Sequence, residues 1–208
     1  MACLLAAALI GYFIGSFPTG YIIGRLCGID VRKLGSGNIG ATNLTRVLGK
    51  QFGYPVFIVD FLKGLVAVLL AIAIAHSCAL SALLRDVCAA LAGLLSVIGH
   101  SYPVWLGFKG GKGVATSLGV IFAINWFAAL LMCLAWVVFF KITRYVSVAS
   151  IAATIALPIA MTALFFRRAL DSPVFIYFSL VLAAVVLVRH RANIERLAKG
   201  TESRFNRP

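Results

Sequence analysis

Three polar blocks, each combining small residues with cations, interrupt a chain that is otherwise strongly apolar. The blocks run from Gly35 to Asn43, from Phe108 to Gly113 and from Arg189 to Leu197. Small residues allow a ligand to approach successive backbone N–H groups, and nearby cations supply positive charge; a phosphate site needs both. Together the three blocks predict one composite site for phosphorylated ligands.

The first block is expected to form an anion-binding nest. Its glycines let N–H groups converge, and Asn43 and Arg46 are spaced so that both can share one helical face. Asn43 is expected to support the loop. The residues expected to contact the anion are Ser36, Gly37, Asn38 and Arg46. The alternative is a flexible loop in which Thr42 or Asn43 caps a short helix.

The second block is expected to be a glycine loop that leads into a helix N-terminus. Its residues are Lys109, Gly110, Gly111, Lys112 and Gly113, and an apolar stretch follows them. Free N–H groups and the helix dipole favour a phosphate at such a place. The alternative is a tight turn whose lysines only set membrane topology. The block is not a nucleotide-binding P-loop, because glycine follows the second lysine where serine or threonine is required.

The third block follows the last apolar stretch and contains His190 and Asn193, three residues apart. Both can line a polar wall, although a histidine between two arginines is also typical of a simple basic stop signal. Glu195 suggests a histidine–glutamate dyad. On a continuous helix it would lie roughly 140° around from His190, which argues against that pairing.

Composition places the chain in the membrane. Of its 208 residues 62% are hydrophobic, against about 45–50% in soluble domains, and 19 Lys and Arg face 6 Asp and Glu. The cations flank apolar stretches, which indicates topology signals and contact with anionic lipids or phosphates and not nucleic acid. The five cysteines form no C-x-x-C pair, so we expect neither a zinc site nor a redox pair, and we expect them to pack as small hydrophobic residues.

The expected fold is an all-α polytopic membrane protein with seven transmembrane helices, forming one domain over residues 1–208. A span needs about 20 apolar residues. The predicted spans are 2–24, 54–76, 86–106, 114–125, 126–140, 146–166 and 173–188. Seven spans place the connection from Arg25, the lysine–glycine block and the basic tail from Arg189 on one side, whereas six would divide them. The N-terminus is therefore expected outside and the C-terminus in the cytoplasm.

Several polar residues fall inside or beside these spans. Pro18 should kink the first helix, and Asp60 and Lys63, three residues apart, should form an ion pair. Ser147 and Ser150 lie near the cytoplasmic end of a span, where they can face a ligand or pack between helices.

The carboxylates are dispersed along the chain, and no hydrolase triad or zinc motif is present. A magnesium-dependent phosphotransferase needs clustered oxygen ligands. The chain is therefore expected to bind phosphorylated molecules without a metal or other cofactor, with their carbon chains entering from lipid.

At this point the motifs resemble those of the bacterial acyl-phosphate:glycerol-3-phosphate acyltransferase family, PlsY. The motifs that carry the resemblance are Gly15-Ser16-x-Pro18, Gly35 to Asn43 with Arg46, Gly99-His100, Lys109 to Thr116, and Arg189-His190-x-x-Asn193-Ile194. The resemblance implies a seven-span inner-membrane enzyme with a cytoplasm-facing site. It implies transfer of an acyl group from acyl phosphate to the sn-1 hydroxyl of glycerol 3-phosphate, giving lysophosphatidate and phosphate, without an obligate protein partner.

The resemblance and the residues together assign roles. We expect Lys112, His190 and Asn193 to be catalytic, and Ser147 and Ser150 to join the two glycine blocks in binding substrate. The base stays open between His190 and a substrate phosphate, whose second pKa is near 6. The phosphate is favoured because no carboxylate is placed to orient the imidazole. A membrane transporter of a phosphorylated small molecule is the alternative function, although the chain shows no convincing internal repeat.

Overall fold

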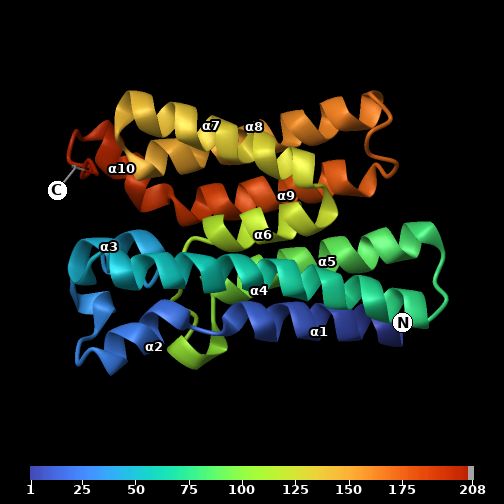
Figure 1. Ribbon diagram of the computed structural model, residues 1–208, viewed down its shortest axis with the longest axis horizontal. Helices are drawn as coiled ribbons and strands as arrows, with labels where there is room; N and C mark the ends of the chain where they lie inside the picture. The colour runs from blue at the N-terminus through green and yellow to red at the C-terminus, as the bar shows by residue number, and fades with distance from the viewer. Residues whose placement is uncertain (206–208) are drawn as a thin grey trace. The chain divides into compact units, whose positions relative to one another are not determined.

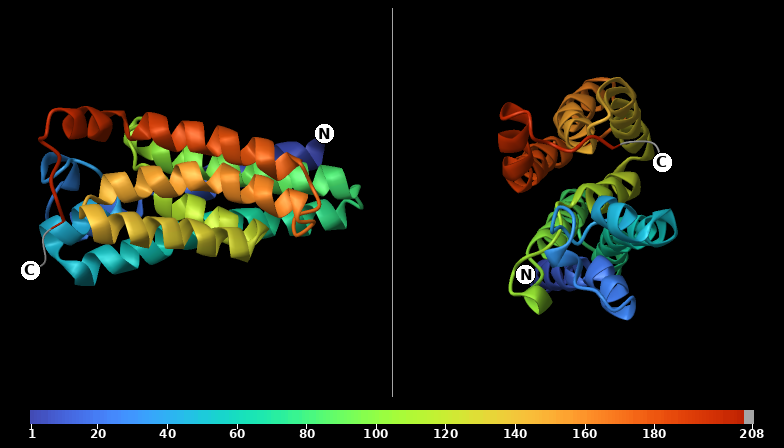
Figure 2. Two further views of the ribbon diagram at one scale, coloured as in Figure 1. Left: turned by 90° about the horizontal axis from the view of Figure 1, so that it is seen from above. Right: turned by 90° about the vertical axis from the view of Figure 1, so that its left-hand side faces the viewer.

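The computed structural model describes residues 1–205, and every regular element in that range is helical. The chain divides into two compact units, the first ending at Ile124 and the second beginning at Asn125, and each is described by itself. Within each unit the long helices run roughly parallel or antiparallel to one another (Figures 1 and 2). The helices of the first unit are α1 (Ala2–Ser16), α2 (Thr19–Leu26), α3 (Ala41–Leu48), α4 (Lys50–Ser77), α5 (Ala82–Ser101) and α6 (Val114–Ile124), with 3-10 turns η1 (Val31–Lys33) and η2 (Val104–Leu106).

Five helical segments in the described residues are long and apolar enough to cross a membrane, which confirms the predicted all-α membrane class. They are Ala2–Leu26, Lys50–Ser77, Ala82–Leu106, Trp126–Thr143 and Val146–Phe166. A sixth is obtained if the bent pair Val174–Arg189 and Arg191–Ala198 is taken as one span. Helix α6 has 11 residues and a length of about 16 Å, roughly half the hydrocarbon thickness. Seven crossings and their orientation therefore stay predictions.

The first span is broken where the sequence predicts a kink. Helix α1 ends at Ser16, and α2 begins at Thr19, directly after Pro18. Proline has no N–H to donate to the preceding turn and cannot continue the helix without distortion. The break leaves the Phe17 carbonyl available to a side chain of another helix, Lys63.

Small residues set the close packing of the first unit. Gly15 of α1 lies directly against the backbone of Ser96 in α5, and Gly64 of α4 lies against the backbone of Thr116 in α6. A Cβ atom at either glycine would collide with a carbonyl oxygen of the neighbouring helix. Membrane helices associate through such small residues, because lipid gives them no hydrophobic driving force to pair.

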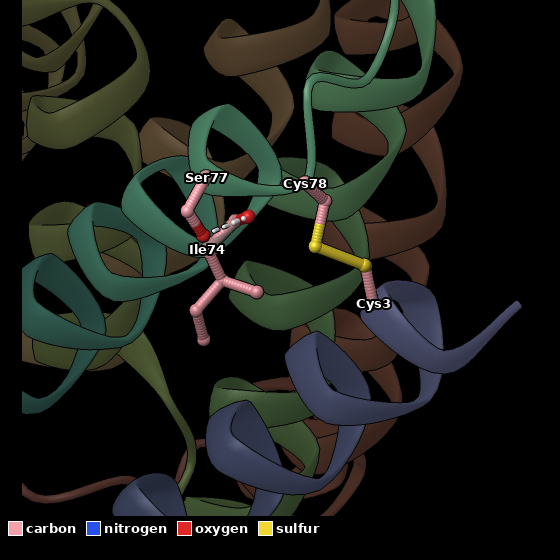
Figure 3. Close-up of a disulfide and its surroundings, with 4 residues drawn as sticks. All are labelled: Cys3, Ile74, Ser77 and Cys78. Atoms are coloured by element: carbon pink, nitrogen blue, oxygen red, sulfur yellow. Dashed lines mark hydrogen bonds between the residues drawn. A yellow bond between two sulfur atoms is a disulfide. The ribbon is translucent and has the colours of Figure 1, made fainter.

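A disulfide joins Cys3 of α1 to Cys78 at the end of α4, with their Cα atoms 7.0 Å apart (Figure 3). The prediction that all five cysteines act as small hydrophobic residues was therefore wrong for this pair; Cys27, Cys88 and Cys133 are free thiols. The two residues are 75 positions apart and meet only because α1 and α4 pack together. The bridge lies at the end of the unit opposite α3 (Figure 1).

The second unit contains α7 (Trp126–Thr143), α8 (Val146–Phe166), α9 (Val174–Arg189) and α10 (Arg191–Ala198). Helices α7 and α8 form an antiparallel pair, and α9 packs against α8 (Figure 1). The tail folds back over the turn between α7 and α8, where the Phe205 N–H donates to the Arg144 carbonyl at 2.9 Å. The tail thus returns to the end of the unit at which α8 begins.

Candidate active site

Asn43 organises the first polar block from inside. Its side-chain oxygen accepts the Ser36 N–H at 2.8 Å, while its amide donates to the carbonyls of Val31 and Leu34 at 3.2 and 3.1 Å. The side chain is 1% exposed, so these bonds form away from water and fix the loop. These contacts are the loop support expected of Asn43, and its part in binding substrate stays a prediction. The alternative of a Thr42 or Asn43 cap is wrong, because α3 begins after Gly40 without a side-chain cap.

The loop held by Asn43 turns its remaining polar groups outward. Gly35 and Gly37 have φ of 58° and 71°, a region that favours glycine, and the chain can therefore turn sharply on both sides of Ser36. The Asn38 side chain accepts the Gly40 N–H at 2.8 Å. Ser36 on the loop and Arg46 on α3 are exposed. The block can thus present a hydroxyl and a guanidinium to an anion from a fixed backbone.

The first two blocks are joined to the same part of the first unit. A small hydrophobic cluster underlies the first block and includes the residue three positions before Lys109. Its buried members are Val31, Ile39, Leu44, Val56 and Leu106. Ile39 lies within the first block and Leu44 directly follows it, while Leu106 ends η2, which leads into the lysine–glycine block. One apolar base thus supports both predicted phosphate loops.

The second block leads directly into a helix, as predicted. Helix α6 begins at Val114, immediately after Gly113, whose φ of 81° turns the chain into it. The loop is anchored on the last turn of α5: the Gly111 N–H donates to the His100 carbonyl at 3.0 Å, and the Gly110 N–H to the Ser101 carbonyl at 3.2 Å. Lys109 is exposed and Lys112 is half-buried. The N–H groups of Gly110 and Gly111 thus hold the loop against the end of α5.

In the second unit, His190 stands at a bend that the sequence does not reveal. Helix α9 ends at Arg189 and α10 begins at Arg191, at 58° to it. The imidazole is 2% exposed, and its Nδ1 lies 2.8 Å from the Val186 carbonyl. A carbonyl only accepts hydrogen bonds, so Nδ1 carries the proton and the neutral ring has its lone pair at Nε2. The Val186 carbonyl therefore helps to orient the ring.

Asn193 is held by a carboxylate that sequence reasoning missed. Its amide donates to Glu202 Oε1 at 2.7 Å, and Arg196 Nε donates to Glu202 Oε2 at 2.7 Å. Burial raises the pKa of the Glu202 carboxyl, but the hydrogen bonds from Asn193 and Arg196 and the nearby Ser147 hydroxyl outweigh it and lower the pKa below its ordinary value. Glu202 thus joins α10, the tail and the start of α8 as an anion. The sequence gives little sign of this contact, because Glu202 lies nine residues after Asn193 in a tail without hydrophobic pattern.

The other acidic candidate of this block points elsewhere. Glu195 pairs with Lys199 at 2.7 Å, and both side chains are 66% exposed. The histidine–glutamate dyad is therefore wrong, as the helical angle already indicated.

The two serines of α8 differ in their surroundings. Ser147 is buried beside the Glu202 carboxylate, though its hydroxyl makes no hydrogen bond of good geometry within residues 1–205. Ser150 is also buried, and its oxygen accepts the Trp136 indole N–H at 3.2 Å. The structure therefore groups Ser147 with Asn193, and it joins Ser150 to the α7–α8 packing.

Comparison with known proteins gives one consistent family. A family model described as Glycerol-3-phosphate acyltransferase matches residues 5–200. The glycerol-3-phosphate acyltransferase of Aquifex aeolicus (strain VF5) is 45% identical over 202 residues, covering 97% of this chain and 98% of that protein. The protein of the same description from Brucella anthropi is 43% identical over 203 residues, covering 97% and 93%.

Two solved structures are similar over nearly the whole chain. Both are of PlsY, described as an integral membrane glycerol 3-phosphate acyltransferase. Its glycerol 3-phosphate form has a TM-score of 0.85 at 44% identity, covering 98% of this chain and 96% of that one. Its lysophosphatidic acid form has a TM-score of 0.83 at 44% identity, covering 98% and 95%.

Proposed function

The chain belongs to the glycerol-3-phosphate acyltransferase family, and we propose that it transfers a fatty acyl group from acyl phosphate to the sn-1 hydroxyl of glycerol 3-phosphate. The products are lysophosphatidate and inorganic phosphate, and the reaction is the first acylation of phospholipid synthesis. The observation that carries this proposal is the family match over residues 5–200, which includes all three polar blocks.

The reaction needs alignment more than activation. The hydroxyl oxygen bonds to the acyl carbonyl carbon, the bond from that carbon to the phosphate oxygen breaks, and the hydroxyl proton passes to a base. Acyl phosphate is a mixed anhydride, so its phosphate is already a good leaving group. Holding the two reactants in register can contribute about 7–11 kcal/mol. The enzyme's main task is therefore to bind two phosphorylated molecules together.

Bringing two phosphates together requires several cations. Two dianions about 6.5 Å apart repel by roughly 10 kcal/mol at an effective dielectric constant near 20. The charge of a single lysine is too small to offset this repulsion. The first unit supplies Arg46, Lys109 and Lys112 around two loops that share one apolar base.

We assign one phosphate to each loop. Lys112, at the entrance to α6, stabilises charge on the leaving phosphate or the carbonyl oxygen, and Lys109, Gly110, Gly111 and Gly113 shape its loop. Ser36, Gly37, Asn38 and Arg46 bind the other phosphate, with Asn43 fixing their backbone. We also assign Ser147 and Ser150 to substrate binding and His190 and Asn193 to catalysis; all four residues lie in the second unit.

The proton acceptor in this proposal is a substrate phosphate. Its second pKa near 6 makes it a competent base at neutral pH, and it lies next to the hydroxyl within the same substrate pair. His190 is the competing base, and its contact with the Val186 carbonyl supports that alternative, because it leaves the Nε2 lone pair to accept a proton.

The site is proposed to face the cytoplasm from a bacterial inner membrane. The distribution of Lys and Arg supports this orientation. The disulfide supports it as well: Cys3 and Cys78 lie at the end of the first unit opposite α3, and disulfides persist in oxidising compartments such as the periplasm.

Release of inorganic phosphate by the purified chain tests the function. The protein in detergent is mixed with acyl phosphate and glycerol 3-phosphate without added metal, and lysophosphatidate is identified by mass spectrometry. Phosphate release that requires both substrates is expected. Uptake of glycerol 3-phosphate into sealed vesicles without acylation would instead favour the transporter alternative.

A further inference from the structure

A group of three titratable side chains lies buried in the first unit, outside the residues assigned to substrate. Asp60 and Lys63 come from α4, and His100 comes from the last turn of α5. Their exposed fractions are 3%, 6% and 5%. Ionisable groups at membrane depth are costly, so a cluster of three calls for a physical reason.

The Lys63 ammonium directs its N–H donors at other groups of the protein. Its Nζ lies 2.7 Å from Asp60 Oδ1, 2.8 Å from the Phe17 carbonyl and 3.3 Å from His100 Nδ1. An ammonium has three N–H donors and no acceptor, so these three contacts use them all. The lysine therefore cannot contact a substrate phosphate, and it ties together α4, α5 and the break between α1 and α2.

The same contact decides the tautomer of His100. Because the ammonium only donates, Nδ1 must accept, and the proton of the neutral ring lies on Nε2. Asp60 Oδ1 is 3.7 Å from Nδ1, too far for a hydrogen bond between the two atoms. The contact with Lys63 thus leaves an N–H on the far side of the ring.

That far side lies against the lysine–glycine loop. A Cβ atom added to Gly111 would collide with Nε2, so the ring edge touches the loop backbone. The carbonyls of His100 and Ser101 accept the N–H groups of Gly111 and Gly110 at 3.0 and 3.2 Å. The loop therefore rests on the residue whose ring Lys63 orients.

We propose that Asp60, Lys63 and His100 are positioning residues that fix the lysine–glycine loop in its phosphate-binding shape. The inference rests on the proposed function for the role of the loop in binding phosphate, whereas the contacts of the loop do not depend on that function. Lys63 fixes the orientation of the His100 ring. The ring and the last turn of α5 fix the backbone conformation at Gly110 and Gly111, and that backbone determines the position of Lys112.

The main test variant replaces both members of the ion pair at once. The single variant Lys63→Met leaves Asp60 buried and unpaired, which is strongly destabilising. The double variant Asp60→Leu with Lys63→Met replaces both charges with apolar groups, a change that is often neutral for stability. Ser96→Ala is the control: Ser96 is also buried in α5, but its hydroxyl bonds only to the Gly93 carbonyl one turn earlier.

Three readouts separate positioning from general support. In the double variant we expect kcat for phosphate release to fall on the order of 100-fold, because a misplacement of about 1 Å can cost that much. Amide hydrogen exchange at Gly110 and Gly111 should be roughly tenfold faster, with the α1–α5 core unchanged. In the wild type, the nitrogen NMR shifts of His100 should show a neutral ring protonated at Nε2.

Two histidine variants sharpen the test. His100→Gln can reach the loop from the position of Nε2, whereas His100→Asn can reach only toward Lys63. Higher kcat in the Gln variant supports the proposal; higher kcat in the Asn variant contradicts it.

The proposal is overturned if the folded double variant keeps wild-type exchange at Gly110 and Gly111, or if the wild-type ring is protonated at Nδ1. If the wild type releases no phosphate, the proposed function fails, while exchange and NMR still decide the positioning role.

Discussion

At His190 a backbone carbonyl determines which ring nitrogen carries the proton. The bond from Nδ1 to Val186 leaves Nε2 as the basic atom, in a ring that is almost fully buried. The residue could therefore act as a base or could serve to bind and orient substrate. The two roles differ in how much turnover depends on a titrating group.

His190→Gln separates these roles. Glutamine keeps a polar side chain of similar reach but cannot take up a proton at neutral pH. If a substrate phosphate is the base, kcat should fall by less than about tenfold, because a general base contributes about 10²–10⁴-fold. Steady-state phosphate release is the measurement, with Glu195→Gln as the control because the Glu195 side chain is exposed and pairs with exposed Lys199. A loss of 100-fold or more would make His190 the base.

Glu202 gives the second unit a pH-dependent contribution to stability. Its pKa is lowered in the folded protein, so its contribution is fully present above the ordinary value of 4.5 and is lost as pH falls through the folded value. Glu202→Gln should lower the free energy of unfolding by about 1 kcal/mol at pH 7, since nearby solvent screens the bonds. Thermal unfolding in detergent should show this difference shrinking at acidic pH. An equal difference at both pH values would contradict the assignment.

At the scale of elements, polar loops are set by the helices that they leave and enter. Helix α5 carries the second block on its last turn, and α6 begins as that block ends. The first block is suspended between η1 and α3 by the Asn43 side chain. The disulfide holds the far end of the same unit, where α1 meets α4.

Removal of the disulfide should weaken the first unit without affecting turnover. Cys3→Ser with Cys78→Ser should lower the free energy of unfolding by about 2–4 kcal/mol, because the bridge closes a long loop. The measurements are thermal unfolding and kcat, with Cys27→Ser, an exposed free thiol, as the control. Alkylation of the unreduced, denatured wild type should label Cys27, Cys88 and Cys133 only. Labelling of all five cysteines would show that the bridge is absent.

The sequence allowed some of these elements to be predicted and hid others. The break at Pro18 and the start of α6 after Gly113 follow from residues that stop or permit a helix. The bend at His190 has no such residue, because its neighbours are all compatible with a helix. The Cys3–Cys78 bridge and the Glu202 contacts join positions far apart or in an unpatterned tail, so they depend on tertiary packing that spacing does not encode.

At the scale of the molecule, each unit supplies a different part of the proposed site. The first unit holds the two phosphate loops over one apolar base, and the second holds Ser147, His190 and Asn193 at the ends of its helices. Hydropathy and charge bias predicted that all of these groups face one side of the membrane. The proposed function requires groups of both units to act on the same pair of substrates.

The most direct test of this account is cross-linking between the two units from a known side of the membrane. Cysteines are placed at exposed Ser36 and at exposed Ile194 in a chain whose three free cysteines are replaced by serine. A short, membrane-impermeant bis-maleimide is then added to inside-out or right-side-out vesicles. Tyr177, near the other end of α9, replaces Ile194 in the control pair. We predict a cross-link between the Ser36 and Ile194 positions in inside-out vesicles only; no cross-link, or one formed from the periplasmic side, would contradict a shared cytoplasmic site.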